Sequence, residues 1–134
     1  MSEPLNFDWE SVHGQRVTAI EGINLRVDQV ARSRYDELAL HLEQGVVVHV
    51  SVNIDTDEVI VRAYPDTSTL DSSLEWKNVD VLKEYVGYEL GWCWIARNYL
   101  GYADTFTLSF AGIEPEVTLV GMASSLYIYR LTRI

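Results

Sequence analysis

The chain has 134 residues, the size of one ordinary domain, and 48% of them are hydrophobic, so it can bury a core without disulfides or metals. Its 20 Asp and Glu against 10 Lys and Arg give a formal net charge of −10, which disfavours nucleic acid as a partner because phosphate binding needs clustered basic residues. The longest run without a charged residue, 117–129, is shorter than the roughly 20 apolar residues of a membrane helix. We therefore expect a single domain over residues 1–134 that does not engage a membrane.

Two features indicate a reducing, cytoplasmic setting. Residues 1–4 lack the basic and apolar segments of a secretory signal. The single Cys93 excludes an intramolecular disulfide and a zinc site built from several cysteines.

The N-terminal part carries two structural signals. Residues 7–12 are predicted to contribute one helical turn. Ile23, Leu25 and Val27 alternate with polar residues, as the side chains of a half-buried strand do, and predict a strand.

Period-two alternation is clearest over residues 36–64 and predicts a three-stranded antiparallel meander. A three-residue first loop ending at Gly45 pairs Leu40 with Val48 and keeps both apolar series on one face. Gly45 then takes the left-handed position that this loop type requires. The second loop, Asp55-Thr56-Asp57-Glu58, is expected to have four residues and to pair Ile54 with Val59.

One short helix is predicted after the Ser- and Thr-rich loop that follows the meander. Val79, Leu82 and Val86 have the spacing of one helix face. Asn78 is the expected N-cap, and Gly87 is the expected stop.

The second half of the chain repeats the strand pattern. A hairpin over 90–110 is predicted to pair Trp94 with Leu108, which places Trp92 and Trp94 toward the core. Residues 117–131 alternate again, with a bulge or turn at 121–124. The whole pattern predicts a β-rich α+β domain, with a mostly antiparallel sheet of about six to eight strands and one short helix.

No motif in the chain predicts catalysis, a cofactor or a metal. His41 and His49 are expected as a diagonal pair on the polar face of neighbouring strands, but zinc requires a third ligand that the pattern does not supply. Phosphate-binding glycine loops and the nucleophile elbow are absent. Cys93 stands in an apolar strand, where its pKa is raised rather than lowered.

Tyrosines near turns and acidic turn residues are the candidate binding residues, because exposed Tyr is a common anchor at protein interfaces. Near the tip of the second hairpin, Asn98 is predicted to lie opposite Asp104. The full set is Asn98, Tyr99, Tyr102, Asp104, Tyr127, Tyr129, Asp55, Asp57 and Glu58.

The stretch 91–104 reads Gly-Trp-Cys-Trp-Ile-Ala-Arg-Asn-Tyr-Leu-Gly-Tyr-Ala-Asp, and it is followed by Phe106-x-Leu108 and by Ala-Ser-Ser-Leu-Tyr-Ile at 123–128. Together with the acidic turn at 55–58, this pattern resembles a family of small uncharacterised bacterial proteins known only as a domain of unknown function. The resemblance implies a bacterial cytoplasmic origin and brings no catalytic residues.

These observations favour a non-enzymatic module that binds another protein. In its sharpest form the hypothesis is an immunity- or inhibitor-type protein that engages a basic partner, because acidic surface steers basic proteins. One alternative is a small-molecule-binding or enzymatic α+β domain, with a pocket on the sheet face lined by Trp, Tyr and His49. Another is a homodimer that uses sheet edges or the face of Tyr127 and Tyr129.

Overall fold

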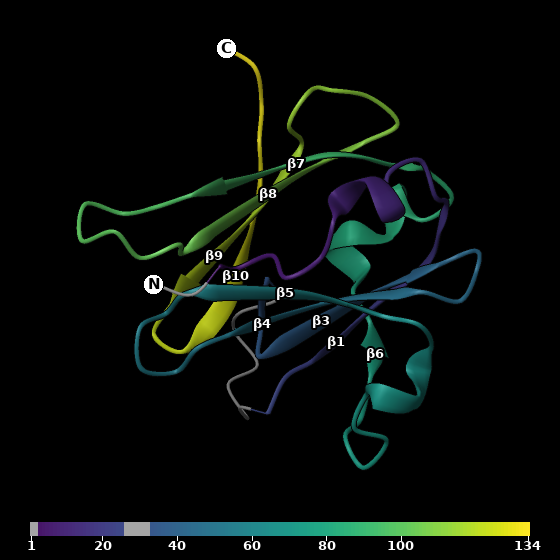
Figure 1. Ribbon diagram of the computed structural model, residues 1–134, viewed down its shortest axis with the longest axis horizontal. Helices are drawn as coiled ribbons and strands as arrows, with labels where there is room; N and C mark the ends of the chain where they lie inside the picture. The colour runs from purple at the N-terminus through teal and green to yellow at the C-terminus, as the bar shows by residue number, and fades with distance from the viewer. Residues whose placement is uncertain (1–2, 26–32) are drawn as a thin grey trace.

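The computed structural model describes residues 3–25 and 33–134, and the regular secondary structure of these residues is mostly β-strand (Figure 1). The strands are β1 (Val17–Ile23), β2 (Arg34–Tyr35), β3 (Glu37–Leu42), β4 (Val47–Val52), β5 (Val59–Tyr64), β6 (Lys77–Asn78), β7 (Leu90–Ala96), β8 (Thr105–Phe110), β9 (Val117–Met122) and β10 (Ser125–Arg130). The helical segments are the 3-10 helices η1 (Trp9–Ser11), η2 (Thr67–Thr69) and η3 (Asp80–Tyr85).

The strands form two five-stranded antiparallel sheets, in the orders β5-β4-β3-β1-β6 and β2-β10-β9-β8-β7. In Figure 1 the sheet of β7 to β10 lies above the sheet of β3 to β5, and η1 and η3 close the space at the right. Alternate side chains of both sheets fill that space, among them the fully buried Leu38, Val50, Phe106, Leu119 and Leu126. The antiparallel, β-rich prediction is confirmed, whereas the predicted strand number is too low.

The meander forms as β3, β4 and β5, and its first register is confirmed. Leu40 pairs with Val48, and Gly45 has a φ of 93°. The second register is wrong, because Val59 pairs with Val52 and not with Ile54. Ile54 lies exposed in a six-residue loop, since residues 53–58 turn away from the sheet and contact the second sheet instead.

The predicted helix is replaced by η3. A 3-10 helix has three residues per turn, so Leu82 and Tyr85 are buried on one side while Val86 is exposed. Asn78 is not a cap, because it belongs to β6 and pairs with Glu21 of β1. The residue at the cap position, Val79, makes no side-chain capping bond.

The N-terminal turn is the 3-10 helix η1, whose cap Asp8 accepts a hydrogen bond from the N–H of Glu10 at 3.1 Å. The strand predicted through Ile23, Leu25 and Val27 is displaced, because Ile23 is the last residue of β1 and Leu25 is exposed beyond it. Val27 lies outside the described residues.

The register of the second hairpin differs from the prediction by one residue. Leu108 pairs with Cys93, and Trp94 pairs with Thr107, because the ladder is irregular between Leu90 and Cys93. At this bulge the Ser109 hydroxyl takes part in the pairing and accepts the Trp92 N–H at 2.7 Å. The prediction of Trp92 and Trp94 in the core is therefore wrong. Their side chains project outward, and that of Trp92 is 51% exposed.

The expected break at 121–124 is the tight turn between β9 and β10. Ala123 and Ser124 both have positive φ, at 48° and 65°, as the two central residues of a type I′ hairpin turn require.

Candidate functional site

Three loops meet at one end of the two sheets, at the left of Figure 1, and we call this region, residues 53–58, 97–104 and 121–125, the loop end. The Val59 N–H donates to the Ala103 carbonyl at 2.8 Å and so joins one sheet to the other. The Ser124 N–H donates to Asp57 Oδ1 at 2.8 Å, and the Ser124 hydroxyl donates to the Ile54 carbonyl at 3.3 Å. The loop end is therefore a hydrogen-bonded assembly of both sheets.

The acidic turn supplies much of this assembly. Glu58 is buried, and its two carboxylate oxygens accept hydrogen bonds from Thr56 Oγ1 at 3.2 Å and from the Ala103 N–H at 3.3 Å. The Asp57 carboxylate accepts a hydrogen bond from the Ser124 N–H. Of the three acidic binding residues predicted in this turn, only Asp55 is exposed. Glu58 and Asp57 position the loops, whereas Asp55 lies at the surface.

Asn98 fixes the tip of the β7–β8 hairpin. Its side-chain oxygen accepts the N–H groups of Leu100 at 2.9 Å and Tyr102 at 3.3 Å, and its amide donates to Asp104 Oδ2 at 3.1 Å. The predicted proximity of Asn98 and Asp104 is thus confirmed. Tyr99 and Leu100 project from this fixed tip with exposed fractions of 95% and 64%.

Tyr127 and Tyr129 lie on the outward side of the β7–β10 sheet, and Tyr129, which pairs with Thr118, is the further of the two from the loop end. The register aligns Trp94, Thr107, Thr118 and Tyr129 in one row across the four strands. We call this surface the uncharged face. Its outward side chains are Trp92, Trp94, Ala96, Thr105, Thr107, Thr118, Val120, Met122, Tyr127 and Tyr129. Sequence periodicity could not find it, because the register error placed its two Trp residues inside.

The two histidines lie on the outward side of the other sheet, and each contacts a glutamate. His41 Nε2 is 2.6 Å from Glu21 Oε1, and His49 Nε2 is 2.6 Å from Glu37 Oε1. His49 also stacks on Tyr64 and meets the edge of Trp76, with ring centroids 5.5 and 6.3 Å apart. These aromatic side chains bury His49 instead of leaving it to line a pocket.

Cys93 and the combinations of metal-ligating side chains are the groups to consider for chemistry. Burial raises the pKa of the Cys93 thiol to about 11, so it is a poor nucleophile at neutral pH. Over residues 3–25 and 33–134, no group of three or more His, Cys, Asp and Glu side chains could hold a metal ion. A hollow of about 200 Å³ lies beside η3 and β10, below the ~300 Å³ at which small-molecule sites begin. At its rim, Arg130 is bonded to the Val81 carbonyl and to Glu84. Another hollow, of about 460 Å³, lies open to solvent between Ile113–Pro115 and Leu131–Arg133, and its volume is within the range of such sites.

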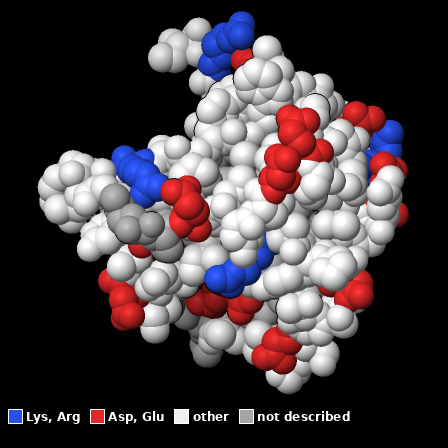
Figure 2. Space-filling model, in the orientation of Figure 1, with Lys and Arg blue, Asp and Glu red and all other residues white. Residues whose placement is uncertain are grey.

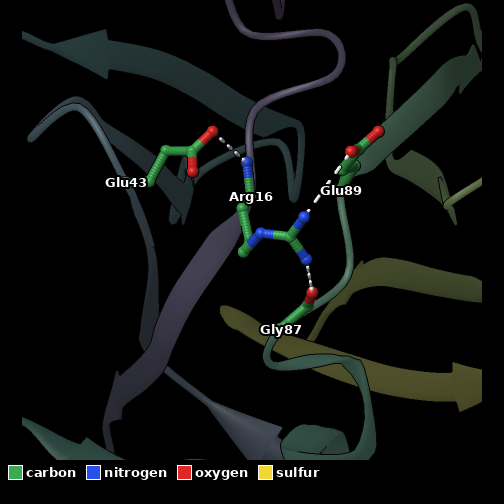
Figure 3. Close-up of polar contacts among 4 residues, drawn as sticks. All are labelled: Arg16, Glu43, Gly87 and Glu89. Atoms are coloured by element: carbon green, nitrogen blue, oxygen red, sulfur yellow. Dashed lines mark hydrogen bonds and ion pairs between the residues drawn. The ribbon is translucent and has the colours of Figure 1, made fainter.

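Arg16 shows how a basic side chain is used within the fold, at the end opposite the loop end (Figure 3). Its guanidinium donates to the Gly87 carbonyl and lies 3.7 Å from Glu89 Oε1, while its backbone N–H donates to Glu43 Oε1 at 3.3 Å. These contacts connect the start of β1 with the segment before β7. On the face seen in Figure 2, the acidic side chains are spread as separate groups and form no single patch.

The model of a family of unknown function matches residues 1–134 of the chain. No curated protein and no solved structure matches it. Within the described part of the chain, no helix has the length and apolar character needed to cross a membrane.

Proposed function

The chain belongs to this family of unknown function (DUF6334), and we propose that it is a non-enzymatic module that binds another protein at its loop end. The observation that carries the proposal is the exposure of Tyr99 and Leu100 at a hairpin tip that Asn98 holds in one conformation. Tyr is enriched among the residues that dominate binding energy. A tip that is ordered before binding loses less conformational entropy when the partner docks.

The partner is a basic protein. The exposed Asp55 lies in the loop end, and the chain as a whole carries a net charge of −10. Because the carboxylates on the face seen in Figure 2 are dispersed, they act by long-range steering of a positively charged surface more than by one cluster of ion pairs. In its sharper form, the chain is an immunity- or inhibitor-type protein that covers a basic toxin domain.

The test is a pair of variants in a tagged chain, purified from cells that produce it at its natural level. We expect the wild type to retain a basic protein and the double variant Tyr99→Ser/Leu100→Ser to lose it, with Kd raised by at least about 30-fold, the effect of losing a residue worth 2 kcal/mol. The matched control is Ile113→Ser, which removes an apolar side chain that is 66% exposed in the loop between β8 and β9. Co-purification followed by titration calorimetry measures both effects.

Two results would contradict the proposal. One is equal recovery of the partner by the wild type and the double variant. The other is loss of the partner from Ile113→Ser to the same degree, which would place the contact elsewhere.

A further inference from the structure

The edge strands of the two sheets differ in how far their outward backbone groups are covered. An edge strand exposes backbone N–H and C=O groups that can pair with another strand, and natural proteins cover or shorten such edges. On β5, the Val61 N–H donates to the Pro4 carbonyl at 2.7 Å, and Leu5 forms a bridge beside it. The edges beyond β1 and β10 are closed by β6 and β2, which have two residues each.

At the fourth edge, the described residues cover β7 where it begins. The Leu90 N–H donates to the Gln15 carbonyl at 2.8 Å, and the Trp9 indole N–H donates to the Gly91 carbonyl at 2.8 Å. From Trp92 to Ala96, no strand of the described residues pairs with the outer side of β7.

The hydrogen bonds of the neighbouring strands show which backbone groups of β7 point to this open side. The Gly121 N–H donates to the Asp104 carbonyl, and the Glu116 N–H donates to the Leu108 carbonyl. Even-numbered backbone groups of β8 therefore point to β9. Because backbone direction alternates along an antiparallel strand, those of Thr107 point to β7.

Thr107 is paired with Trp94, so the backbone groups of Trp94 point to β8. The same alternation directs the N–H and C=O groups of Cys93 and Ile95 to the open side. The side chain of Trp94 meanwhile projects onto the uncharged face, and that of Ile95 packs against the core.

Beyond the bulge between Leu90 and Cys93, this open edge lacks the residues that usually protect an edge strand. Residues 92–96 read Trp-Cys-Trp-Ile-Ala and contain no Lys and no Pro, the residues with which natural edge strands block pairing. The adjoining uncharged face also carries no charged side chain on β7, β8, β9 or β10. On the fifth strand, β2, Arg34 lies on the same face opposite Tyr127, but it is buried and stands at the edge of the sheet away from β7. In a chain of net charge −10, two copies can approach here without bringing like charges together.

We propose that the open edge of β7 pairs antiparallel with β7 of a second copy of the chain. The pairing joins two five-stranded sheets into one continuous sheet across a twofold axis, and each copy contributes the same residues. Cys93 then lies opposite Ile95 of the second copy, and Trp94 lies opposite its own equivalent in a pair whose side chains are close together. A basic partner would gain no charge complementarity at this edge, whereas an identical uncharged strand meets no repulsion.

The proposal is tested by sedimentation velocity on the full chain at concentrations up to about 100 µM, where a Kd in the micromolar range gives mostly dimer. We expect the wild type to be a dimer and Trp94→Lys to be a monomer, because two Lys residues directly opposite one another repel. Ile95→Pro, which removes an N–H directed to the open side, is expected to be monomeric as well. The matched control is Tyr129→Lys, which places the same charge on the uncharged face but on β10, and it is expected to remain a dimer.

A wild type that stays monomeric at the highest concentration would overturn the proposal. So would dimers of a Trp94→Lys variant that unfolds at the same temperature as the wild type, or a monomeric Tyr129→Lys, which would show that faces stack instead. The loop-end variant Tyr99→Ser/Leu100→Ser remains dimeric, so failure of this proposal and failure of the proposed function are separable.

Discussion

Gly121 lies so close to the 53–58 loop that there is no room for a side chain larger than its hydrogen atom. It lies in β9 where the 53–58 loop crosses over it, and a Cβ at this position would lie 2.0 Å from the Asp57 carbonyl oxygen. That oxygen belongs to the backbone of a turn residue with a φ of 62°, so it cannot move aside alone.

We expect Gly121→Ala to lower the free energy of unfolding by about 3 kcal/mol, the upper part of the range for overpacked interiors. Urea denaturation measures the change. The control is Gly112→Ala, whose added Cβ meets nothing within 4 Å and should change stability by less than about 0.5 kcal/mol. Equal effects of the two substitutions would contradict the crossing of the loop over β9.

Cys93 supplies a prediction about reactivity. Because burial raises its pKa from 9.0 to about 11, the native thiol is protonated at neutral pH. The rate of alkylation by iodoacetamide should therefore rise about tenfold per pH unit until pH approaches 11. In urea, where the thiol is exposed, the rate should level off above pH 9.0. A native profile that levels off below pH 9 would contradict the burial of this side chain.

At the scale of elements, periodicity identified most strands but not every register. The three-residue loop at Gly45 was predictable, because only one loop length keeps two alternating apolar series on one face. In β7, both alternating series are apolar, so periodicity alone could not choose between Trp94 and Ile95 as the inward residue. The bulge that Ser109 stabilises makes Ile95 the inward residue. Because Ser109 lies on β8, the pattern within β7 alone does not reveal this bulge.

The residues of the candidate site also divide into those with local contacts, which the sequence could predict, and those with distant contacts, which it could not. Asn98 bonds to residues two to six positions away, and the hairpin predicted over residues 90–110 placed it near Asp104 at the tip. Glu58 and Asp57 bond instead to Ala103 and Ser124, which are 45 and 67 positions away. Such contacts depend on how the two sheets pack, so the sequence marked these residues as acidic turn residues without revealing that they hold the loops together.

The 3-10 geometry of η3 is open to a direct test, because an α-helix would bury Val86 in place of Tyr85. Tyr85 stacks on Phe110 with ring centroids 4.5 Å apart. Tyr85→Ala should therefore cost about 3–4 kcal/mol, as removal of a buried aromatic ring does, and Val86→Ala should cost less than about 1 kcal/mol. Chemical denaturation of both variants gives the comparison. The reverse order of costs would restore the helical interpretation.

At the scale of the whole molecule, the chain carries a net charge of −10, and on the face seen in Figure 2 the carboxylates lie in separate groups. Repulsion between separated exposed charges is screened by salt. We expect Tm to rise by about 4 °C, equivalent to about 1 kcal/mol, between low ionic strength and 0.5 M NaCl. Differential scanning calorimetry at several salt concentrations measures it. A Tm that falls would mean that exposed ion pairs such as Arg16–Glu89 outweigh the repulsion.

The connection between β2 and β3 affects how the molecule can be divided. Only Asp36 separates these strands, yet β2 pairs with β10 in one sheet and β3 pairs with β1 and β4 in the other. Tyr35 of β2 pairs with Leu126 of β10, which is far away in the sequence. Because contacts between distant residues slow folding, we expect folding on the slower timescale typical of β topologies. A cut anywhere between β5 and β9 leaves β2 in the N-terminal fragment and its partner β10 in the C-terminal fragment. Neither fragment therefore contains both strands.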